Sequence, residues 1–237
     1  MFFCYFYKKY CLAAVPKPFF SVIMNFSGAY PEQGFLPKGA ETLDFSALEG
    51  CEFYCSSEAA SAIRTAIAPY GPEGIHWIDS GDYHYVSLFW LEKIREPFEL
   101  LLFDHHSDDQ APSFGGEVLS CGSWVGEARG TLPLMKRDCW IDGASPLPSL
   151  EPSGLPLYLS IDKDILCRCS ARTTWDQGEL MLDDLLSAIA CLCAGRRIIG
   201  ADVCGEISFL KGGSRYDAAV NLETNTILQD FLLNLRD

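Results

Sequence analysis

The chain has 237 residues, 49% of them apolar, and a formal net charge of -14. This length suits one domain with a sizeable hydrophobic core, which excludes disorder for most of the chain. The acidic balance disfavours nucleic acid and anionic membrane surfaces, because their negative charges repel a negative protein. We therefore expect no nucleic-acid or membrane partner.

The first 23 residues are aromatic and cationic, unlike the acidic remainder. Lysines and prolines interrupt their apolar run well short of the roughly 20 residues that a membrane span requires. We therefore expect neither a signal peptide nor a membrane anchor in this segment. Our hypothesis is that residues 1–23 are an N-terminal extension, that the native start is Met24, and that residues 24–237 form a single domain.

Short apolar runs alternate with amphipathic stretches along the rest of the chain. Helices are predicted at residues 57–69, 83–94, 180–194 and 216–235, and strands at residues 52–55, 75–79, 99–103, 139–141, 157–161 and 197–203. This alternation predicts an α/β fold in which a mainly parallel sheet is covered on both faces, a three-layer αβα sandwich.

The eleven cysteines do not form the pattern of a disulfide framework. Their number is odd, and several lie inside apolar runs, as Cys191, Cys193 and Cys204 do. Paired Cys-x-x-Cys segments typical of structural zinc are also absent from the sequence. We expect a reducing cytoplasm as the compartment.

Polar residues gather where the predicted strands end. The sequence reads Asp-Ser-Gly-Asp-Tyr-His at residues 79–84, Asp-His-His-Ser-Asp at residues 104–108 and Asp-Lys-Asp at residues 162–164. Asp202 and Glu206 follow another strand. Because the carboxyl ends of parallel strands meet along one edge of a sheet, we expect these groups in one cleft.

The spacing of these residues points to a metal centre. Alternate residues of extended backbone share a side, so Asp104, His106 and Asp108 are expected to point one way, and Asp162 likewise with Asp164. Converging carboxylates repel one another unless cations neutralise them. Carboxylates with a minority of imidazoles suit a divalent ion such as Mn²⁺, and this set is large enough for two ions.

These motifs resemble those of the arginase/agmatinase ureohydrolases, which have the arginase–deacetylase fold. Residues 104–108 match the family's Asp-x-His-x-Asp motif, residues 160–164 match its Ser-x-Asp-x-Asp motif, and the resemblance spans residues 75–206. It implies an arginase–deacetylase-like fold and a metal-dependent hydrolase that cleaves a C–N bond of a small guanidino, amidino or amide-type substrate. It also implies that the chain can form a homo-oligomer.

The resemblance further implies a set of ligands for two Mn²⁺ ions. One ion would be held by His84, Asp104, Asp108 and Asp162, and the other by His106, Asp104, Asp162 and Asp164. Asp104 and Asp162 would thus serve both ions. The implied nucleophile is a hydroxide that bridges the two ions.

Departures from the family pattern argue against arginine hydrolysis itself. The family's Gly-Asp-His segment is one residue longer here, at residues 81–84. Cys121 stands where the family has its proton-shuttle His, so it is a candidate proton donor or nucleophile, or else a buried residue at a helix start. Glu206 is the candidate for the guanidinium-binding Glu of the family's catalytic site, yet it follows Asp202 by four residues where the family has three.

Two alternatives stay open. The first is a single-metal amide deacetylase of the related fold, although the second Asp of each motif, Asp108 and Asp164, argues against it. The second is a metal-binding protein that has lost catalysis together with the shuttle His. The number of metal ions per chain and the presence of turnover distinguish these readings.

Overall fold

The computed structural model describes residues 20–111, 118–149 and 153–235. Its main sheet has seven strands in the order β2-β1-β4-β9-β8-β5-β7, and every neighbouring pair is parallel. In chain order the strands are β1 (Ser21–Asn25), β2 (Glu41–Asp44), β4 (Gly74–Trp77), β5 (Phe98–Phe103), β7 (Met135–Ile141), β8 (Leu157–Asp162) and β9 (Ile198–Cys204). A separate antiparallel pair consists of β3 (Tyr54–Cys55) and β6 (Leu119–Ser120).

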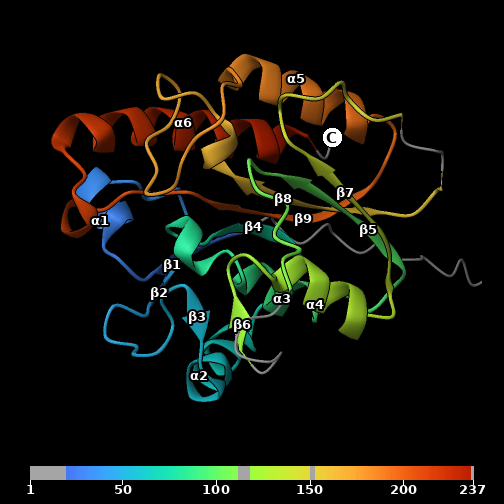
Figure 1. Cartoon of the computed structure of the whole chain (residues 1–237), viewed down its shortest axis with the longest axis horizontal. Coiled ribbons are helices and arrows are strands. Elements are labelled where there is room, and N and C mark those ends of the chain that lie inside the picture. Colours follow the sequence, from blue (N-terminus) through green and yellow to red (C-terminus); the bar gives the residue numbers. More distant parts are fainter. Residues whose placement is uncertain (1–19, 112–117, 150–152, 236–237) are drawn as a thin grey trace, which may run out of the picture.

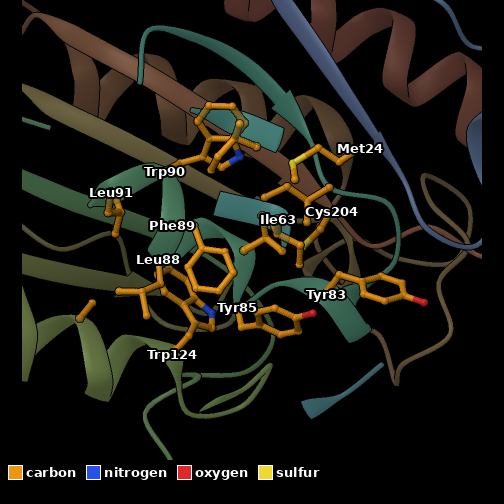
Figure 2. Packing of buried hydrophobic residues seen from close by; sticks show 14 of the residues in the cluster. Met24, Ile63, Tyr83, Tyr85, Leu88, Phe89, Trp90, Leu91, Trp124 and Cys204 are labelled. Atoms are coloured by element: carbon orange, nitrogen blue, oxygen red, sulfur yellow. The ribbon is translucent and has the colours of Figure 1, made fainter. Parts of the chain in front are cut away.

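Helices cover both faces of the main sheet (Figure 1). One face carries α1 (Ala29–Gln33), α5 (Leu182–Cys193) and α6 (Arg215–Asn234); the other carries α2 (Ser57–Ile67), α3 (Val86–Leu91) and α4 (Trp124–Thr131). Each interface holds its own apolar cluster, and Figure 2 shows part of the cluster around Ile63, Phe89 and Trp124. The predicted three-layer αβα sandwich is therefore confirmed.

The predicted elements are present, with shifts that have local causes. The helix expected at residues 83–94 is shorter, because residues 81–83 form the 3₁₀ turn η1 (Gly81–Tyr83), which the Ser80 side chain caps. The strand expected at residues 52–55 pairs with β6 and lies outside the main sheet. The sequence patterns missed the strand β1, the exposed strand β2 and the short elements α1 and β6. They also missed α4, whose two glycines weaken its helical signal.

β1 corrects the expected domain boundary. Its residues Ser21, Val22 and Ile23 pair with Ile75, His76 and Trp77 of β4, so they belong to the folded domain. Val22 and Ile23 are almost completely buried. The domain therefore includes residues that we had placed in the extension, while residues 1–19 lie outside the described part of the chain.

The helices and the cysteines bear on the expectations about a membrane anchor and about disulfides. None of the helices in the described part of the chain has the length and apolar character that crossing a bilayer requires. The cysteines that the structure describes are all free thiols, and most of them are buried.

A chain that begins at Met24 is expected to be less stable than one that begins at Phe20. The shorter chain loses Val22 and Ile23, and burial of each such side chain contributes about 1.5–3 kcal/mol. Urea unfolding followed by circular dichroism measures the difference, with the full chain as reference. Equal unfolding midpoints for the two truncated chains would show that the start of β1 contributes nothing.

Candidate metal centre

The candidate site lies at the carboxyl ends of four adjacent strands, β4, β9, β8 and β5. The segments that follow β4, β5 and β8 deliver its side chains into one cavity of about 240 Å³. All six residues predicted as metal ligands line this cavity: His84, Asp104, His106, Asp108, Asp162 and Asp164. The structure therefore brings together the whole set that the two motifs and the upstream His indicated.

The backbone after β5 and β8 turns, which differs from the extended alternation that we expected. Asp104 accepts a hydrogen bond from the backbone N–H of His106 at 2.6 Å, and Asp108 has a positive φ of 48°. Asp162 accepts from the backbone N–H of Asp164 at 2.9 Å and so caps the 3₁₀ turn η3 (Lys163–Ile165). Turns closed by the first Asp of each motif, rather than strand alternation, bring the acidic residues to the cavity.

His84 is the centre of the first group of donor atoms. Its Nδ1 lies 3.1 Å from Oδ2 of Asp104, 3.0 Å from Oδ2 of Asp108 and 3.6 Å from Oδ2 of Asp162. The residue is 1% exposed, and the direction of these contacts leaves Nδ1 without a hydrogen-bond partner. A buried ring nitrogen thus faces three carboxylates and forms a hydrogen bond with none of them.

His106 is the centre of the second group. Its Nδ1 lies 2.9 Å from Oδ2 of Asp164 and 3.6 Å from Oδ1 of Asp104. Asp104 therefore turns one oxygen toward His84 and the other toward His106. A carboxylate placed in this way can serve two neighbouring cations.

Hydrogen bonds on the far side of each imidazole orient its Nδ1 toward the carboxylates. Nε2 of His84 lies 2.9 Å from the hydroxyl of Ser160, which donates its own proton to Asp202 at 2.6 Å. The hydroxyl must therefore accept from Nε2–H of His84, which leaves Nδ1 with a lone pair in the neutral ring. Nε2 of His106 lies 3.3 Å from Oδ1 of Asp176, a contact that likewise keeps Nδ1 of His106 directed toward the carboxylates.

Three of the four carboxylates hold their protons more strongly than usual when no cation is among them. Burial, reinforced by neighbouring carboxylates, raises the pKa of Asp108, Asp162 and Asp164. Burial also acts to raise the pKa of Asp104, but the nearby imidazoles of His106 and His84 and the backbone N–H of His106 outweigh it, and the pKa is lowered. Hydrogen bonds to Asp104 and Asp164 raise the pKa of His106 to about 11.

The donor set fits divalent cations. Among the described residues, the four carboxylates form ion pairs with His84 and His106 and with no Lys or Arg. Three donor groups of this kind can be traced, of which one contains His84, Asp104 and Asp108 and another contains Asp104, His106 and Asp164. A cation between the unpartnered Nδ1 and the carboxylates would offset their repulsion and their desolvation.

Cys121 lines the same cavity, but its thiol is not activated. Burial and the nearby Asp108 raise the pKa of Cys121 to about 12, so the group is a neutral thiol at physiological pH. Cys121 is 9% exposed and shortly precedes α4, which fits the alternative of a buried residue at a helix start. A Cys121 thiolate is therefore not the nucleophile of the metal-free protein.

Glu206 does not reach the cavity, which corrects its expected catalytic role. The residue is fully buried and forms an ion pair with Lys163. Its other partners are amide side chains, namely Gln33, Asn221 and Asn225. Directly before Glu206, the backbone of Gly205 has a φ of 90° and passes so close to Asp162 that a Cβ there would collide with Oδ1 of Asp162.

Several groups contact the six predicted ligands in ways that the sequence motifs did not indicate, although Asp202 was expected in the same cleft. Trp124 donates from its indole nitrogen to Oδ2 of Asp108 at 2.7 Å. Ser160 and Asp202 form the relay behind His84, and Cys204 lies beside Asp162. The register of the sheet is what places Ser160, Asp202 and Cys204 at the site. Along β8 and β9, Ser160 pairs with Asp202 and Asp162 pairs with Cys204.

Comparison with known proteins agrees with this architecture. No family model matches the chain. An uncharacterized protein from Thermotoga maritima is 31% identical over 197 residues, which cover 78% of each chain. Proclavaminate amidino hydrolase from Streptomyces clavuligerus is 14% identical with a TM-score of 0.64, and covers 93% of this chain and 92% of its own. Arginase from Medicago truncatula is 14% identical with a TM-score of 0.65, and covers 92% of this chain and 87% of its own.

The fold and the acidic strand-end site define an arginase-fold protein, and the expected resemblance to the arginase/agmatinase ureohydrolases is confirmed for the fold. The chain belongs to the same family as the Thermotoga maritima protein.

Changing Ser160 to Ala is expected to weaken divalent-metal binding by about 10–100-fold, because the relay that orients His84 is lost. Isothermal titration of the metal-free protein with Mn²⁺ measures the affinity. Ser187→Ala, on the exposed face of α5, is the matched control and should bind as the unchanged chain does. An unchanged affinity in Ser160→Ala would contradict the role of the relay.

Proposed function

We propose that this protein is a metal-dependent hydrolase that cleaves a C–N bond of a small guanidino, amidino or amide-type molecule. The observation that carries the proposal is the unpartnered, buried Nδ1 of His84 among three carboxylates, beside a second donor group that shares Asp104. The arginase and the amidino hydrolase that share the fold support the same class of reaction.

In this proposal two Mn²⁺ ions occupy the two donor groups. His84 and Asp108 hold one ion, His106 and Asp164 hold the other, and Asp104 and Asp162 serve both. Two divalent ions at such a site supply Lewis acidity and a water acidic enough to attack at neutral pH. The protein's own contribution is to keep both Nδ1 atoms directed inward and to fix Asp108 through the Trp124 indole.

The walls of the cavity favour a planar, cationic or neutral substrate. Phe53 and Trp175 lie edge to face with ring centroids 6.0 Å apart, and Trp175 also contacts the ring of His106 at 5.8 Å. Tyr54 completes this aromatic side of the cavity, and no Lys or Arg among the described residues lines it. Aromatic faces attract planar cations. Lys211 already lies over the ring of Phe53, with Nζ 5.2 Å from its centroid, so Trp175 is the aromatic wall that remains for a substrate.

The neutral thiol of Cys121 can take part in binding. It lines the cavity together with Ser120 and Gln110, and its backbone N–H donates to the carbonyl of Phe53 at 3.0 Å. A protonated thiol and an amide offer hydrogen bonds to a bound substrate without adding charge. We therefore assign Cys121 a binding role in this proposal rather than that of a nucleophile.

Metal content and turnover test the proposal together. After reloading with Mn²⁺, the unchanged chain is expected to hold about two ions and to hydrolyse a member of a panel of guanidino, formimino and acyl-amide compounds. Asp104→Asn and Asp162→Asn should lose both properties, because each carboxylate is assigned to both ions. Atomic emission and assays for released urea or ammonia are the readouts.

Asp183→Asn, an exposed residue in the first turn of α5, is the matched control and should behave as the unchanged chain does. Circular dichroism of each metal-free variant separates loss of metal from loss of fold. Full occupancy in Asp104→Asn and Asp162→Asn would remove the proposed centre. About one ion per chain would favour the amide deacetylase, and two ions without turnover on any compound would favour a non-catalytic metal-binding protein.

A further inference from the structure

Cys204 occupies a position next to the proposed metal centre that the sequence motifs do not account for. It is the last residue of β9, and the register of the sheet pairs it with Asp162, the last residue of β8. Its Sγ lies 3.1 Å from Oδ2 of Asp162. This oxygen is also the one that faces Nδ1 of His84 at 3.6 Å.

The three side chains form a donor group in their own right. Sγ of Cys204, Nδ1 of His84 and a carboxylate oxygen of Asp162 all lie within 4.8 Å of one another. All three residues are buried, and Nδ1 of His84 has no hydrogen-bond partner. The cysteine is thus not isolated, because an unsatisfied buried nitrogen is directed at the same point.

The other surroundings of Cys204 are apolar. It belongs to the cluster between the sheet and the helices α2, α3 and α4, which also contains Met24 and Ile63 (Figure 2). The thiol therefore stands at a boundary, with hydrocarbon on one side and the donor atoms of His84 and Asp162 on the other. Asp162 is the hydrogen-bond acceptor of this thiol in the structure.

We infer that Cys204 is a thiolate ligand of the ion held by His84, so that this position of the centre has nitrogen, oxygen and sulfur donors. The inference rests on the metal centre of the proposed function. On binding, the S–H bond of Cys204 breaks, a bond from Sγ to the ion forms, and the proton leaves to solvent. The second position, at His106, keeps nitrogen and oxygen donors alone.

This difference in donors predicts a difference in metal preference between the two positions. Thiolate is a soft ligand that favours Zn²⁺ and Co²⁺, whereas carboxylate suits Mn²⁺. The position at His84 should therefore bind the softer ions with the greater relative affinity. Changing Cys204 to Ser should weaken Zn²⁺ binding by at least about 10–100-fold and weaken Mn²⁺ binding less.

Co²⁺ titration of the metal-free full chain, followed by absorption spectroscopy, tests the inference directly. The unchanged chain should show a near-ultraviolet sulfur-to-cobalt charge-transfer band together with the visible bands of bound Co²⁺. Cys204→Ser should lose the charge-transfer band and keep the visible bands. Cys121→Ser and Cys169→Ser are the controls, the first for the other thiol at the cavity and the second for an exposed one, and both should keep the band.

The possible failures are distinguishable. Visible bands without a charge-transfer band in the unchanged chain would overturn the role of Cys204 while leaving the metal centre intact. A band that persists in Cys204→Ser would assign the sulfur to another cysteine and overturn the inference as well. No cobalt bands at all would overturn both the inference and the metal centre of the proposed function. The Co²⁺ spectrum of the unchanged chain tests the inference even if the Cys204→Ser variant does not fold.

Discussion

The crowding of four buried carboxylates around two imidazoles is the constraint on which the site depends. Nδ1 of His84 lies 3.0 Å from Asp108 and 3.1 Å from Asp104, and it is satisfied by neither. Without a cation, protons must neutralise this group, as the raised pKa values of Asp108, Asp162 and Asp164 indicate. Divalent ions would replace those protons, so the geometry is that of a preformed receptor for cations.

The rest of the fold keeps these groups in place from both faces of the sheet. On the side of α4, Trp124 reaches from an apolar cluster to hold Asp108. On the side of α6, Lys163 lies between Asp162 and Asp164 in sequence and points the opposite way, into a buried ion pair with Glu206. Lys163 also donates to Asn225 of α6 at 2.8 Å. The turn after β8 is thus anchored by its middle residue, while its two acidic neighbours face the cavity.

Much of the fold and six residues of the candidate site could be predicted from the chain, because both depend on local patterns. Acidic residues that follow buried strands must meet at one edge of a parallel sheet, whatever the details of the turns. The expectation that these side chains alternate along extended backbone is nevertheless wrong, because the chain turns at Asp104 and at Asp162. Glu206 and Cys204 could not be placed, because their positions depend on the register of β9 against β8 and on the positive φ of Gly205.

The most direct measurement is a crystal structure of the full chain grown with Mn²⁺, with anomalous diffraction used to locate the ions. We predict two anomalous peaks about 3.5–4 Å apart, one among His84, Asp104 and Asp108 and the other among Asp104, His106 and Asp164. Asp104 and Asp162 should be the neighbours that both peaks share. The absence of a peak in the cavity, or a lone peak outside these two donor groups, would contradict a binuclear centre at this edge of the sheet.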